Sequence, residues 1–181
     1  ANLVTAARTR AMAAGQSTRL LVCVDETVVA GEPLRYLRCV VLQTQTSAGW
    51  QLAGETWLRE GIFILPGNFP AIPDGLFPAG GGSWVRSDGA ALRSTALRAN
   101  RITTEALGGM PAAVRWAAIS FSAFGGTAES GNIVVATGRR RSPGSYRAGE
   151  SPVELENPER VRGLSLSVYG VPALINGRAS F

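Results

Sequence analysis

Apolar positions near the start of the chain recur at helical spacing. The stripe of mostly small side chains that would face inward comprises Leu3, Ala7, Ala11 and Ala14. Gly15 follows, and glycine readily adopts the positive φ with which many helices end. Because about a dozen helical residues are only marginally stable alone in water, we expect a helix over 3–14 that packs on the rest of the chain.

Short apolar or alternating stretches after this helix predict β-strands. The stretches 20–24 and 34–42 flank a turn near Gly31 and predict a β-hairpin. The stretch 162–169 alternates most clearly, with its apolar residues facing inward and its serines facing outward; the inward set is Leu164, Leu166 and Val168. Further stretches with strand-like patterns are 50–58, 61–65, 115–124, 132–137 and 171–176.

Three segments interrupt this pattern. The segment 66–83 contains too many Pro and Gly residues for regular structure, so it predicts an irregular loop whose packing residues are Phe69, Ile72, Leu76 and Phe77. The segment 103–107 could form one helical turn. The segment 138–145 is rich in Arg, Gly and Pro and indicates a basic loop between strands.

Together these elements predict an α+β fold, in which an N-terminal helix packs on antiparallel β-sheets and most of the chain is β with long irregular loops. A chain of 181 residues suits one domain and can bury a substantial core. We therefore expect a single domain over 1–181, with the helical part at 1–15 and a β-rich globular part at 16–181.

Cys23 and Cys39 would lie opposite each other if the hairpin turns near Gly31. A disulfide there would close a loop of about 15 residues and stabilise the fold by about 3 kcal/mol in the chain-entropy model. Cross-strand Cβ atoms are usually somewhat too far apart for a relaxed disulfide. The sequence therefore leaves two alternatives, a bridge or two buried free thiols.

The composition argues against most catalytic chemistry. All 18 basic residues are Arg, the net charge is +5, and there is no His. The missing His removes the usual general base near neutral pH, the commonest metal ligand and any Ser-His or Cys-His pair. Two cysteines make a structural zinc site implausible. We therefore expect no catalytic, cofactor-binding or metal-binding residues and no small-molecule substrate.

Two other features have a functional and a structural interpretation. Arg139, Arg140 and Arg141 form the densest run of charge; they could contact phosphates of nucleic acid or an anionic surface, or form a solvated hairpin tip. Trp116 and Tyr169 could stack on bases or sugars, although aromatic residues at strand spacing usually belong to the core. The carboxylates at 150–159 surround two prolines and are more typical of a solvated loop than of a glycosidase pair.

Both ends of the chain resemble the soluble part of type IV pilin-like proteins, in particular the GspH/FimT minor pseudopilins. At the front, the similarity covers Ala6-Ala-Arg-Thr-Arg-Ala11 and then Arg19-Leu-Leu-Val-Cys-Val24, a helix motif followed by an apolar first strand. At the back, Arg162-Gly-Leu-Ser-Leu-Ser-Val-Tyr-Gly170 is similar to the closing strand and its Gly turn. The middle of the chain is similar to these proteins only in having short predicted strands joined by variable loops.

The resemblance implies a structural, non-catalytic subunit of a type II secretion pseudopilus or a type IV pilus. Its partners would be other pilins or pseudopilins, and some members of the group bind DNA. The subunit would be anchored in the bacterial inner membrane by a preceding helix of roughly 20 apolar residues, with this domain in the periplasm or on the cell surface. A prepilin-type leader should precede that helix, and the full gene sequence tests this.

The competing interpretation is a secreted β-sandwich that binds carbohydrate or protein. Such a module would not need an alanine-striped helix at its N-terminus. An ordinary signal peptide ahead of this stretch would favour the binding module over the pilin-like subunit.

Overall fold

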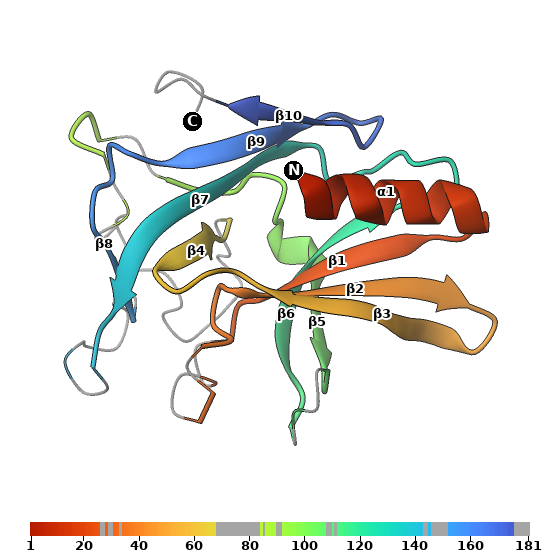
Figure 1. Cartoon of the computed structure of the whole chain (residues 1–181), viewed down its shortest axis with the longest axis horizontal. Coiled ribbons are helices and arrows are strands. Elements are labelled where there is room, and N and C mark those ends of the chain that lie inside the picture. The colour runs from red at the N-terminus through yellow and green to blue at the C-terminus, as the bar shows by residue number, and fades with distance from the viewer. Residues whose placement is uncertain are drawn as a thin grey trace.

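The computed structural model describes residues 1–25, 28, 31–32, 34–67, 84, 86–89, 92–107, 110, 112–142, 145 and 152–175. One N-terminal helix, α1 (Asn2–Ala14), packs against antiparallel β-sheets (Figure 1). Strands account for 44% of the described residues and helices for 12%, so this part of the chain is mostly β. The predicted α+β fold is confirmed.

The first sheet has five antiparallel strands with the first strand at its centre. Their order is β3 (Gly49–Trp57), β2 (Cys39–Thr46), β1 (Thr18–Cys23), β6 (Val114–Phe121) and β5 (Ile102–Glu105). Strand β1 hydrogen-bonds to β2 on one side and β6 on the other, and five of its six residues are buried. Apolar residues on both faces of β1 are therefore expected, because neither face meets water.

The second sheet is built mainly from strands of the C-terminal part of the chain. Its order is β10 (Pro172–Ile175), β9 (Arg162–Leu166), β7 (Gly131–Arg140) and β4 (Ile62–Leu65). Strand β7 is the longest, and beyond the segment that pairs with β4 its end pairs with β8 (Val153–Leu155). A short 3₁₀ helix, η2 (Ala99–Arg101), leads into β5.

Helix α1 lies between strand β1 and the turn that joins β9 to β10 (Figure 1). The Thr18 hydroxyl donates to the Ala7 carbonyl over 2.9 Å, and Arg8 Nε donates to the Tyr169 carbonyl over 3.0 Å. Gly15 ends the helix with φ 60°, the left-handed conformation that the sequence predicted there. Buried side chains of α1 and of both sheets belong to one hydrophobic cluster.

Three expectations from the pattern were wrong or lie outside the described residues. The segment predicted as a helical turn contains strand β5, which pairs with β6. Val168 was expected to face inward but is 56% exposed, because β9 ends at Leu166 and Val168 belongs to the following turn. The packing residues proposed for the Pro/Gly-rich segment lie outside the described part of the chain.

Candidate functional site

The predicted packing stripe of α1 is mostly where the pattern placed it. Ala7 and Ala11 are fully buried, and Leu3 is partly buried against the core. Ala14 is exposed at the last position of the helix, just before Gly15, so its assignment to the stripe was wrong. Val4, which the stripe omitted, is buried instead.

The opposite face of α1 is exposed and carries small or polar side chains, namely Thr5, Ala6, Thr9 and Ala13. Beside it, a hollow of about 420 Å³ lies between the end of α1 and the hairpin formed by β2 and β3. Leu52, which is 56% exposed, lines that hollow together with Ala13 and Ala14. This side of the helix could therefore accept another protein surface at close range.

The basic run does not form the loop that the sequence predicted. Strand β7 continues through Arg140, because Arg139 pairs with Glu154 and Arg140 pairs with Val153 on β8. The Arg139 guanidinium also forms an ion pair with Glu154, with Nη2 2.9 Å and Nε 3.0 Å from Oε2. Arg141 follows the strand and donates its backbone N–H to the Pro152 carbonyl. The Arg139 side chain is thus already paired with a carboxylate.

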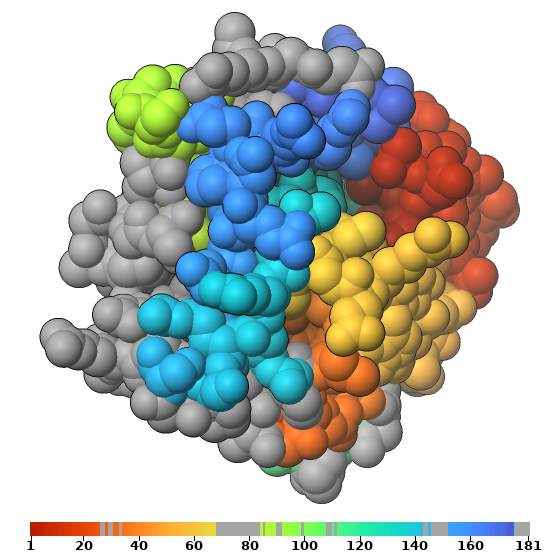
Figure 2. All heavy atoms as spheres, turned by 60° about the vertical axis from the view of Figure 1, so that its left-hand side comes forward, coloured from red at the N-terminus to blue at the C-terminus, as the bar shows by residue number. Residues whose placement is uncertain are grey.

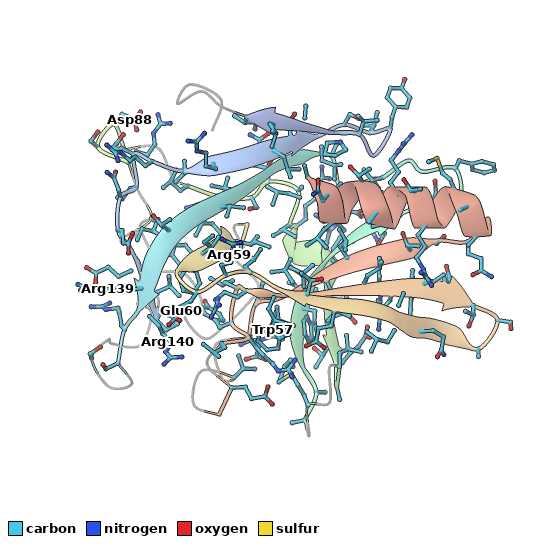
Figure 3. The ribbon with its side chains drawn as sticks, in the orientation of Figure 1. Trp57, Arg59, Glu60, Asp88, Arg139 and Arg140 are labelled. Atoms are coloured by element: carbon cyan, nitrogen blue, oxygen red, sulfur yellow. The ribbon has the colours of Figure 1, made fainter. Side chains whose placement is uncertain are left out.

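A groove of about 390 Å³ lies between the end of β7, the turn that precedes β2 and the start of β4. Its lining includes apolar, acidic and cationic side chains: Leu34, Arg38, Glu60, Phe63, Arg139 and Arg140. Figure 2 shows the end of β7 in cyan beside the orange and gold segments that carry the other lining residues. Figure 3 shows Glu60 close to Arg140 at this end of the molecule.

The turn at 34–38 positions two arginines in different surroundings. Arg35 forms ion pairs with Glu32 and Glu55 and lies over the Trp57 ring, 4.9 Å from its centroid. Leu37 has φ 58°, a conformation that non-glycine residues rarely adopt, and its backbone bonds to Cys23 and Ile64. This turn directs Arg38 toward the groove. Sequence reasoning missed Arg38, because nothing in the pattern separates a buried arginine from the many exposed ones.

Cys23 and Cys39 are both buried and free. The pairing of β1 with β2 places Val22 opposite Val40, and the same register carried one residue further places the two cysteines opposite each other. Burial, the main cause, raises the pKa of each thiol to about 12. Such thiols are protonated near neutral pH and are poor nucleophiles.

The other features singled out in the sequence divide between core and surface. Trp116 is fully buried and its indole N–H donates to the Glu105 carbonyl over 3.1 Å, so the predicted alternative of a stacking platform is wrong for this residue. Tyr169 is 74% exposed in the turn after β9. Among the described residues, no group of three His, Cys, Asp or Glu side chains could hold a metal ion.

No helix within the described residues is long and apolar enough to cross a membrane. Comparisons of the chain with protein-family models, with curated proteins and with solved structures find no match.

Proposed function

We propose that this protein is a structural, non-catalytic subunit of pilin type, a minor pilin or pseudopilin of a type II secretion pseudopilus or a type IV pilus. The observation that carries the proposal is the placement of α1. Its Val4, Ala7 and Ala11 side chains are buried on the sheet, while Ala6 and Thr9 on the opposite face are exposed. A helix docked on one side only leaves its other side for neighbouring subunits in a fibre.

The chemistry of the exposed helix face supports this role. Ala6, Thr9 and Ala13 are small, and small side chains allow two helices to approach closely. In the proposed fibre, the partners are other pilins or pseudopilins, and the subunit is held at the bacterial inner membrane by a preceding apolar helix. The globular domain then lies in the periplasm or on the cell surface.

The alternative, a secreted β-sandwich that binds carbohydrate or protein, gives α1 no evident purpose beyond covering part of the core. The two sheets and the groove would suit that class equally well. The exposed small-residue face of α1 therefore favours the assembly role over the binding module.

Photo-crosslinking of the full-length protein in its own cells tests the assembly role. A photoreactive amino acid at Thr9 on the exposed helix face should give adducts with other pilin-type subunits. The matched control places the same amino acid at Asp88, which is also exposed and lies at the other end of the molecule from α1 (Figure 3). Absence of adducts at Thr9, or cleavage of the precursor by an ordinary signal peptidase, would contradict the proposal.

Nucleic-acid contact is a second candidate function, and one observation favours it. The exposed Arg140 side chain stands at the end of β7 beside the groove, next to Arg141, where both could reach a phosphate backbone. Glu154 and Glu60 oppose this role, because they add negative charge to the same surface. Any DNA contact is therefore weak and non-specific.

A further inference from the structure

Arg38 is a buried cation whose charge lacks a partner within the described part of the chain. The residue is only 8% exposed. Its Nη2 donates to the Leu58 carbonyl over 2.8 Å, whereas its buried Nε has no hydrogen-bond partner. No carboxylate of the described residues lies within ion-pair distance of it. A buried guanidinium in this state is destabilising unless something else satisfies it.

The contrast with Arg35, on the same turn, shows what is missing. Arg35 is buried to a similar extent, but two carboxylates and the Trp57 ring surround its guanidinium. Arg38 instead lines the groove at the end of β7. The groove is open to solvent on one side, so an anion can approach the guanidinium from there, and it contacts the buried Nε only if neighbouring side chains move.

We propose that the groove binds a small oxyanion, a carboxylate or a phosphate, through Arg38. The planar guanidinium presents parallel N–H donors that match two oxygens of either group. Arg140, on the rim, adds a second positive charge, and Arg139 stands beside it in its ion pair with Glu154. This proposal does not depend on the assembly role.

The walls of the groove define the kind of anion that fits. Leu34 and Phe63 supply apolar surface beside the cationic side chains, which suits an anion carried on a short apolar group. Glu60 also lines the groove and repels additional negative charge. The preferred ligand is therefore a small anion of low charge rather than a long polyanion, which would contact only the rim.

Thermal unfolding at constant ionic strength tests the site with four sodium salts: phosphate, acetate, butyrate and, as the reference, chloride. If the Kd is about 1 mM, a binding anion at about 10 mM raises the Tm of the wild type by roughly 4 °C relative to chloride. A larger shift with phosphate identifies a phosphate site, and a larger shift with butyrate than with acetate identifies an apolar carboxylate. Equal Tm values in all four salts would overturn the proposal.

Arg38→Gln is the decisive variant. It should abolish the anion-dependent shift and should unfold in chloride at the same temperature as the wild type or higher, because an unpaired buried charge has been removed. Arg93→Gln, which removes one exposed positive charge outside the groove, should retain the full shift. An undiminished shift in Arg38→Gln would overturn the proposal.

Two measurements keep the test decisive if Arg38→Gln does not fold. Arg140→Gln changes an exposed rim residue, and it should weaken anion binding several-fold by isothermal titration. In the wild type, the Nε–H resonance of Arg38 should shift on titration with the binding anion, because a negative charge beside the guanidinium alters the surroundings of this N–H. Unchanged binding by Arg140→Gln together with an unshifted Nε–H resonance would exclude a site at Arg38.

Discussion

Glu105 illustrates how single polar side chains stabilise the first sheet at its edge. It accepts from the Thr103 hydroxyl over 2.7 Å and pairs with Arg19, whose guanidinium also lies over the Trp50 ring. Partial burial alone would raise the pKa of Glu105, but the Thr103 and Arg19 interactions outweigh it and lower the pKa below its ordinary value of 4.5. The charged form is therefore favoured in the folded state.

The lowered pKa makes the stability of the fold depend on pH through this residue. A carboxylate with a depressed folded-state pKa contributes stability above about pH 4.5, and the contribution is lost as the pH falls through the folded-state value. Glu105→Gln should lower the free energy of unfolding by about 1 kcal/mol at pH 7 and by less at pH 3. Urea unfolding of the wild type and the variant at pH 7 and at pH 3 measures this difference in stability. A difference that is as large at pH 3 as at pH 7 would contradict the prediction.

The two cysteines lead to a second prediction at the residue scale. Because burial raises the pKa of both thiols to about 12, neither should react with a thiol reagent such as DTNB in the folded protein at pH 8. After unfolding in guanidinium chloride, Cys23 and Cys39 should both react with the reagent. No reaction after unfolding would reveal the disulfide alternative, and rapid reaction of the folded protein would show that the thiols are accessible.

At the scale of elements, α1 is stabilised chiefly by its contact with β1. Ala11 is fully buried there, so Ala11→Arg must displace neighbouring side chains and bury a charge. We expect a loss of about 3 kcal/mol in unfolding free energy. Ala13→Arg, on the exposed face of the same helix, should change stability little. Equal denaturant midpoints for the two variants would show that α1 is not docked as described.

The same elements show which parts of the fold the sequence could predict. Helix α1 and the strands with clear alternation were predictable, because burial of one face imposes a period that is visible in the residues. Strand β5 was not, because four residues carry too little pattern and their conformation depends on pairing with β6. The length of β7 was missed for a similar reason: β8 extends a strand that Gly138 and the arginines would otherwise end.

The candidate site was predictable only in part. Arg139, Arg140 and Arg141 attract attention as a run of charge, but the sequence gave no sign that Glu154 partners Arg139. Arg38 was invisible as a site residue, because arginine is usually exposed and its burial depends on the turn around Leu37. Long-range contacts decide which members of a charged set remain available for a ligand.

At the scale of the whole molecule, the helix and the groove occupy different ends. Figure 1 places the C-terminal end of α1 on one side and the C-terminal end of β7 on the opposite side. Packing of α1 against neighbouring subunits would therefore leave the groove exposed to solvent.

The net charge of +5 provides a non-specific attraction to DNA that must be separated from contact at the end of β7. Two phosphate contacts, from Arg140 and Arg141, predict a log-log salt slope near −2 for duplex DNA and a Kd of about 1 μM or weaker. Arg140→Gln combined with Arg141→Gln should bring the slope close to zero. Arg93→Gln combined with Arg98→Gln removes the same charge from other exposed positions and should leave the slope near that of the wild type. Fluorescence anisotropy with a labelled duplex at several salt concentrations measures the salt slope of each double variant. An equal decrease of the slope in the two double variants would show that binding depends on net charge alone.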